Sequence, residues 1–167
     1  VTISERGNGQ PRTAVITIRS IDAIIKEEEK RRQSRMAESL AKMSGGFFIY
    51  RAIEDERILY VNPAVMDIYG CESIDEFFQL TGGSFRGMVH PEDWERVERE
   101  INWQTQHSDE NMDYVQYRIV RKDGQVRWID DCGHLESSKW GEENRLFYVL
   151  IHDITDSITP LQKEKLL

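Results

Sequence analysis

The sequence lacks the features that mark membrane, secreted and nucleic-acid-binding proteins. Its two cysteines, Cys71 and Cys132, show no CxxC spacing, and no apolar secretory segment opens the chain, so we expect a reducing, cytoplasmic location. No run approaches the roughly 20 apolar residues of a membrane-spanning helix, which predicts no membrane contact for this segment. The net charge of −8 argues against a nucleic-acid surface, because phosphate binding requires clustered lysine and arginine.

Metal-binding and catalytic patterns are also missing. The four histidines, His90, His107, His134 and His152, form no HxH or HxxxH spacing, and neither cysteine pairs with one of them in a ligand pattern. A catalytic site would need a positioned nucleophile, base or metal. We therefore predict that this segment has no metal site, no catalytic residue and no enzymatic activity.

What the chain does have is enough apolar and aromatic sequence for one domain with appendages. Its 167 residues suit one core of ordinary size. Residues 1–22 predict a hairpin, because β-branched residues flank the turn at Gly7-Asn8-Gly9. From Ser20 to Met43 there is no Gly or Pro, and apolar residues occur only toward the two ends, which predicts a connecting helix over residues 23–43.

In residues 44–156 the pattern predicts two strands, then a group of helices, then three more strands. The predicted strands cover 47–52, 58–62, 112–121, 125–135 and 145–152, and two short helices cover 63–69 and 73–80. A longer helix opens at His90-Pro91-Glu92-Asp93 and continues to about Gln106, with Trp94, Val97 and Ile101 on one face. Tight hairpins such as that at Lys122-Asp123-Gly124 predict an α+β fold rather than parallel βαβ units.

Four motifs in this order resemble the PAS domain of the PAS/PAC sensory-box family over about residues 45–155. They are Ile58-Leu59-Tyr60-Val61-Asn62-Pro63-Ala64, His90-Pro91-Glu92-Asp93, the hairpin from Tyr117-Arg118 through Arg121-Lys122-Asp123-Gly124 to Trp128, and Asp153-Ile154-Thr155. The resemblance implies a five-stranded antiparallel sheet of order 2-1-5-4-3 with the helices on one face. It also implies a fragment of a bacterial signal-transduction protein, with residues 44–156 as the PAS domain and 157–167 as the start of a C-terminal signalling helix.

The N-terminal segment has the layout of the C-terminal one. A hairpin followed by a charged helix occurs in both, and Ile18, Ile21 and Ile25 fall level with Ile151, Ile154 and Ile158. This predicts that residues 1–22 are the tail of an upstream PAS-like domain. The alternative is an N-terminal extension that packs on the same domain.

Alternation along the predicted strands suggests a pocket between the sheet and the long helix. The nine predicted lining residues are Phe48, Tyr50, Leu59, Val61, Trp94, Val97, Ile101, Tyr117 and Val149. The same residue types also build a packed core, so a small ligand and a filled interior both remain open. Where many PAS domains carry Gly shortly before the last motif, this chain has Tyr148 and Val149, which would shrink a cavity.

Haem and flavin are not predicted as cofactors. The reactive-cysteine segment of the blue-light flavin PAS domains, of the N-C-R-F-L-Q type, is absent. The predicted long helix contains no histidine between Trp94 and Trp103, where haem-binding PAS domains place theirs. An unidentified small ligand is the remaining expectation.

The last motif suggests how a signal would leave the domain. Asp153 and Thr155 can bond to backbone at the strand exit, and Asp153 can pair with a basic residue near Arg121 and Lys122. Together with Ile154 these residues are the predicted signal relay, which would fix the angle of the following helix. A plain helix N-cap is the simpler interpretation.

The predicted function is a sensory and dimerisation module that acts on an output domain in the same chain. The resemblance to the PAS family implies that this output domain is a histidine kinase of a two-component system or a GGDEF-type diguanylate cyclase. A ligand-free protein-interaction module that sets the oligomeric state is the alternative. We expect a homodimer whose contact comes largely from residues 1–43. An isolated hairpin and an isolated, highly charged helix are each marginally stable, so both should pack against the domain of this chain or of a second copy.

Overall fold

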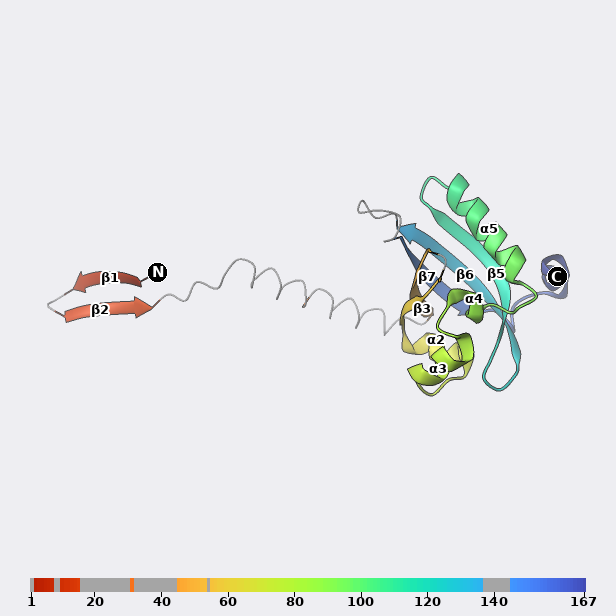
Figure 1. Cartoon of the computed structure of the whole chain (residues 1–167), viewed down its shortest axis with the longest axis horizontal. Coiled ribbons are helices and arrows are strands. Elements are labelled where there is room, and N and C mark those ends of the chain that lie inside the picture. Colours follow the sequence, from red (N-terminus) through yellow and green to blue (C-terminus); the bar gives the residue numbers. More distant parts are fainter. Residues whose placement is uncertain (1, 8–9, 16–30, 32–44, 54, 137–144) are drawn as a thin grey trace. The chain divides into compact units, whose positions relative to one another are not determined.

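The computed structural model describes residues 2–7, 10–15, 31, 45–53, 55–136 and 145–167, which are coloured in Figure 1. The chain divides into two compact units, Val1–Ser39 and Leu40–Leu167. In the first unit, β1 (Thr2–Gly7) pairs antiparallel with β2 (Gln10–Val15), which confirms the predicted hairpin. Residues 16–30 and 32–44, which hold the predicted connecting helix, lie outside the described residues.

The second unit is built on a five-stranded antiparallel sheet. Its strands are β3 (Gly46–Arg51), β4 (Ile58–Val61), β5 (Met112–Val120), β6 (Val126–Glu136) and β7 (Leu146–Asp153). They lie in the order β4-β3-β7-β6-β5, so the predicted order 2-1-5-4-3 is confirmed. The β5–β6 turn follows from its Asp-Gly sequence: Gly124 has φ +80°, and the Asp123 carboxylate accepts from the N–H of Gln125 at 2.9 Å.

Four helices lie between β4 and β5 in the sequence and cover one face of the sheet (Figure 1). They are α2 (Pro63–Tyr69), α3 (Ile74–Thr81), α4 (Phe85–Met88) and α5 (Trp94–His107), and α6 (Pro160–Leu166) follows the last strand. Helix α4 was not predicted, because four residues are too few to show a helical period. Gly70 ends α2 in the left-handed conformation at φ +70°, as its position predicts.

Asn62 explains why the first motif of the domain folds as it does. Its side chain is fully buried, caps α2 by accepting from the N–H of Val65, and accepts from the N–H of Phe47 at 2.9 Å. Its amide also donates to the carbonyl of Gly45 at 3.1 Å. One side chain thus joins the start of β3 to the start of α2.

The free edge of β5 is bonded to α5 and to the segment before it. Gln104 donates to the carbonyl of Tyr114 at 3.0 Å and accepts from its N–H at 2.9 Å. Arg96 donates to the carbonyl of Gln116 at 2.9 Å. At Arg118, the carbonyl accepts from the N–H of His90 at 2.7 Å and the N–H donates to Asp93. The hydrogen bonds that a neighbouring strand would make to the β5 backbone are therefore made by α5 and the residues just before it.

Candidate functional site

A cavity of about 440 Å³ opens between the sheet and helices α4 and α5. This is within the range of small-molecule sites, roughly 300–1,000 Å³. Its walls are Tyr50, Ala52, Ile53, Glu56, Phe85, Arg86, Trp94, Glu98, Ile101, Asn102, Thr105, Leu135, Arg145 and Phe147. A second hollow of about 550 Å³ shares Arg86 and Trp94 with it but has no other aromatic residue. The first cavity is therefore the better candidate for an organic ligand.

Stacked aromatic rings form the floor of this cavity. The Tyr50 ring lies between those of Phe85 and Phe147, with centroid distances of 4.6 and 4.9 Å and interplanar angles of 16° and 11°. Trp94 meets Phe85 edge-on at 5.9 Å. The rings pack on one another and form one continuous aromatic wall.

Three of the nine predicted pocket residues line the cavity, namely Tyr50, Trp94 and Ile101. Four others, Phe48, Val97, Tyr117 and Val149, are buried in the core and are not part of its wall. Val61 is partly buried against that core.

The assignment of Leu59 to the pocket is wrong, because this side chain is 48% exposed. The pairing of β3 with β4 shifts between Ile49 and Tyr50, so that Tyr50 lies opposite Ile58 rather than Leu59. This β-bulge changes the phase of the inward side chains, and Ile58 is buried in place of Leu59.

The charged residues of the cavity were not predicted. Glu56 belongs to the loop between β3 and β4, and burial together with the nearby charge of Glu98 raises its pKa to about 7, although a backbone hydrogen bond and the charge of Arg86 oppose the shift. The guanidinium of Arg86 lies 5.5 Å from the centre of the Trp94 ring. A partly desolvated carboxylate therefore stands beside aromatic rings.

Two further carboxyl groups are buried in the sheet, on the side that faces the helices. Asp131 of β6 accepts from the hydroxyl of Tyr117 at 2.6 Å, and burial raises its pKa well above the ordinary value. Asp113 of β5 is 1% exposed, and its Oδ1 has no hydrogen-bond partner among the described residues. It lies opposite Gly133, where a Cβ atom would overlap that oxygen. Burial raises the pKa of Asp113 to about 7.

Replacing Asp113 by asparagine is expected to change how stability depends on pH. Because the folded-state pKa lies above the ordinary 3.8, the stabilising contribution of the protonated acid is complete below about pH 4 and is lost as pH rises to about 7. The limiting slope is about 1.4 kcal/mol per pH unit. Urea unfolding between pH 4.5 and 8 should show a smaller loss of stability for Asp113→Asn than for the parent.

Asp109→Asn is the matched control, since Asp109 is exposed in the turn before β5. It should leave the pH profile of the parent unchanged. Parallel profiles for the parent and Asp113→Asn would show that Asp113 ionises normally in the folded protein.

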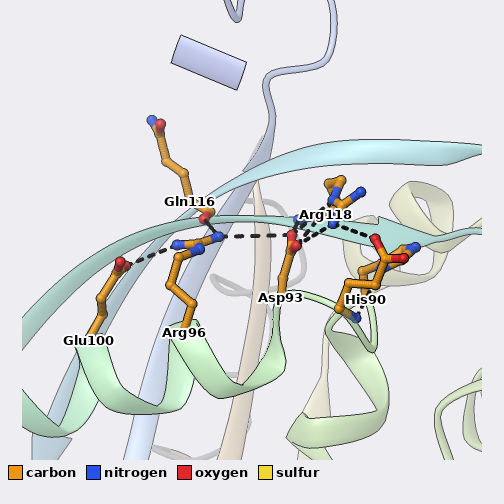
Figure 2. A network of polar contacts seen from close by, with 7 residues as sticks. His90, Asp93, Arg96, Glu100, Gln116 and Arg118 are labelled. Carbon is orange, nitrogen blue, oxygen red and sulfur yellow. Dashed lines mark hydrogen bonds and ion pairs between the residues drawn. The ribbon is translucent and has the colours of Figure 1, made fainter. Parts of the chain in front are cut away.

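A buried ion pair joins the start of α5 to β5 (Figure 2). Asp93 is 3% exposed, and it receives the backbone N–H of Arg118 at 2.8 Å and its Nε at 3.1 Å. Burial alone would raise the pKa of Asp93, but the hydrogen bonds and charge of Arg118 lower it below the ordinary value. Arg96 lies on the same carboxylate at 3.9 Å and on Glu100 at 3.1 Å. The network fixes the long helix against the edge of the sheet.

Trp128 connects the C-terminal end of β7 to the Asp93–Arg118 ion pair. Its ring centre lies 6.0 Å from the guanidinium of Arg118, and its backbone N–H donates to the Thr155 hydroxyl at 2.9 Å. The N–H of Ile154 donates to the carbonyl of Trp128 at 2.8 Å, and Asp153 accepts from the N–H of Thr155 at 2.9 Å. The expected bonds from Asp153 and Thr155 to the backbone are therefore present.

Asp153 pairs with a basic residue near the Arg121-Lys122 turn, as expected, and that residue is Arg127 at 4.0 Å. Arg121 and Lys122 themselves have other partners: Lys122 pairs with Glu76 at 2.8 Å, and Arg121 lies 3.8 Å from Asp123. The simpler interpretation as a helix N-cap fails, because Thr159 caps α6.

Metal-ligand clusters and membrane-spanning helices are both missing from the described part of the chain. There, no three His, Cys, Asp or Glu side chains gather as a metal site would require. No helix within those same residues is both long and apolar enough to cross a membrane.

Comparison with known proteins gives one family and many related folds. A family model described as PAS fold matches residues 58–149. The PAS domain of a protein from Colwellia psychrerythraea has a TM-score of 0.61 at 17% identity, over 75% of this chain and 98% of that one. The PAS domain of an HTR-like protein from Haloarcula marismortui has a TM-score of 0.58 at 16% identity, over 79% and 99%.

A sensory box histidine kinase/response regulator from Burkholderia thailandensis E264 has a TM-score of 0.51 at 20% identity, over 80% of this chain and 89% of that one. No curated protein sequence matches the chain. At these identities the structural similarities show the fold and nothing further.

Proposed function

The chain belongs to the PAS family, whose model matches residues 58–149, and from this premise we propose that it is a non-catalytic sensory module. A small ligand in the 440 Å³ cavity is the proposed signal. The observation that carries the proposal is the course of β7. This strand contributes Phe147 to the cavity and leaves the sheet at Asp153, directly before the segment that leads into α6.

The proposed relay passes through Thr155. A ligand that moves Phe147 acts on β7, and the hydroxyl of Thr155 couples the end of that strand to the backbone of Trp128. Trp128 in turn lies beside Arg118, which holds the long helix through Asp93. Both walls of the cavity, sheet and helix, thus converge on the residues that precede α6.

Native mass spectrometry of protein purified from cells tests the sensory role, and hydrogen exchange tests the relay. We expect one small molecule per chain, and slower amide exchange over residues 154–166 in the loaded protein than in protein freed of the molecule by dialysis. Thr155→Val should retain the molecule but lose the exchange difference, because valine cannot accept the Trp128 N–H.

Thr155→Ser is the matched control, since it keeps the accepting hydroxyl and should keep the exchange difference. If no molecule accompanies the purified protein, the sensory role is refuted and the ligand-free interaction module takes its place. If the exchange difference survives in Thr155→Val, the route through Thr155 is wrong.

We also propose that the module acts as a homodimer and serves an output domain in the same polypeptide. The name of the Burkholderia thailandensis relative supports a histidine kinase as that output, with a GGDEF-type diguanylate cyclase as the alternative. Residues 1–43 are the proposed dimer contact. Sedimentation of the whole chain beside a version starting at Ser44 should give a dimer and a monomer, respectively; a dimer in both would place the contact elsewhere.

A further inference from the structure

The polar side of the cavity carries two carboxylates that lie close enough to affect each other. Glu56 comes from the β3–β4 loop and Glu98 from the middle of α5, and both line the cavity. The charge of Glu98 is the strongest charge acting on Glu56, and it opposes ionisation. Bringing a cation between them would relieve that repulsion and compensate the partly buried carboxylate of Glu56.

The aromatic side of the cavity suits the same kind of group. Trp94 and Phe147 line it, and the electron-rich faces of aromatic rings attract cations in desolvated surroundings. Arg86 already places a guanidinium 5.5 Å from the Trp94 ring, and its own side chain is exposed at the rim. The cavity thus combines rings and carboxylates, as sites for organic ammonium groups do.

The cationic residues of the cavity do not make it an anion site. Among the residues that the structure describes, Arg86 is the cation whose charge acts on Glu56, and its guanidinium lies on Trp94. Arg145 lines the cavity from the start of β7, and its charge is not among those that shift Glu56.

We propose that the cavity binds a small organic ammonium compound, with its cationic nitrogen held between Glu56 and Glu98 beside the aromatic rings. This inference rests on the proposed sensory function and names the chemical class of its ligand. An amine and an amino acid share this group. They differ at the other end, where a carboxylate would reach Arg145.

Isothermal titration of the full chain with three probes of equal carbon length tests the proposal. The probes are butylammonium, 4-aminobutyrate and butyrate. Butylammonium or 4-aminobutyrate should bind at one site per chain, and butyrate should not. Glu56→Gln and Glu98→Gln should each raise the Kd by about tenfold or more, since each removes a charged partner from the ammonium.

Glu110→Gln is the control for the loss of one negative charge, because Glu110 is exposed before β5 and outside the cavity. It should leave the Kd unchanged. Arg145→Gln separates the two sources: it should weaken 4-aminobutyrate but not butylammonium. Urea unfolding checks that each variant is folded. Glu56→Gln and Glu98→Gln should keep the stability of the parent, because they remove no apolar contact.

Binding of butyrate in preference to both ammonium probes would overturn the ligand class, and so would equal Kd values for the parent and Glu56→Gln. If native mass spectrometry finds a bound molecule without a cationic nitrogen, the class is wrong while the sensory function stands. If no molecule accompanies the protein and no probe binds, both proposals fail.

Discussion

Arg118→Ala is expected to lower the free energy of unfolding by about 3–5 kcal/mol, the range for breaking a buried ion pair. The substitution leaves the carboxylate of Asp93, only 3% exposed, without the guanidinium that is its main partner. It also removes the cation that lies beside Trp128. Urea unfolding at pH 7 measures the loss.

Lowering the pH should reduce the difference in the free energy of unfolding between the parent and Arg118→Ala. Because the pKa of Asp93 is lowered in the folded parent, its contribution is present above the ordinary value of 3.8 and is lost as pH falls through the folded-state pKa. In Arg118→Ala a protonated Asp93 no longer carries an unpaired charge.

Arg99→Ala is the control for Arg118→Ala, since Arg99 is an exposed arginine on α5. It should change stability by less than about 0.5 kcal/mol. A loss below about 1 kcal/mol for Arg118→Ala would mean that water replaces the guanidinium at Asp93.

Trp94→Ala is expected to cost about 3–5 kcal/mol, as large-to-small changes of buried aromatic residues do. The Trp94 ring is 6% exposed and packs on Phe85 between the cavity and the second hollow. Its removal joins the two spaces, and the stacked floor loses its lateral support. Thermal and urea unfolding should both report the loss.

The same helix offers a matched control in Trp103, which is 62% exposed and stacks on His107 at 4.7 Å. Trp103→Ala should cost less than about 1 kcal/mol, because little of the ring is removed from water. Similar losses for the two tryptophans would show that Trp94 is not part of the core.

Sequence periodicity predicted the sheet well where alternation runs without interruption. Along β5, Val115, Tyr117 and Ile119 are each at most 2% exposed, as their spacing predicts. The same alternation puts Asp113 on the inward phase of β5, as it puts Asp131 on that of β6. Because the side chains of a strand alternate between its two faces, a carboxyl group at an inward position is the pattern expected of a buried acid.

The cavity itself was harder to predict, because its walls come from segments far apart in the sequence. Phe147 is two residues before Val149 on the same face of β7 and could have been found by alternation. Phe85 and Glu56 lie in a four-residue helix and a loop, where no period exists. Leu59 was misplaced because a β-bulge depends on the pairing of two strands and leaves no trace in the local pattern of either.

The bonds along the outer side of β5 have a consequence for aggregation. An exposed edge strand is a template to which a strand of another molecule can add. Between Tyr114 and Arg118 that template is occupied, because Gln104, Arg96, Asp93 and the backbone of His90 already bond to the outward-facing groups. A foreign strand would have to displace a helix before it could pair here. Along Tyr114–Arg118, two copies can therefore meet only through side chains and cannot continue one sheet into the other.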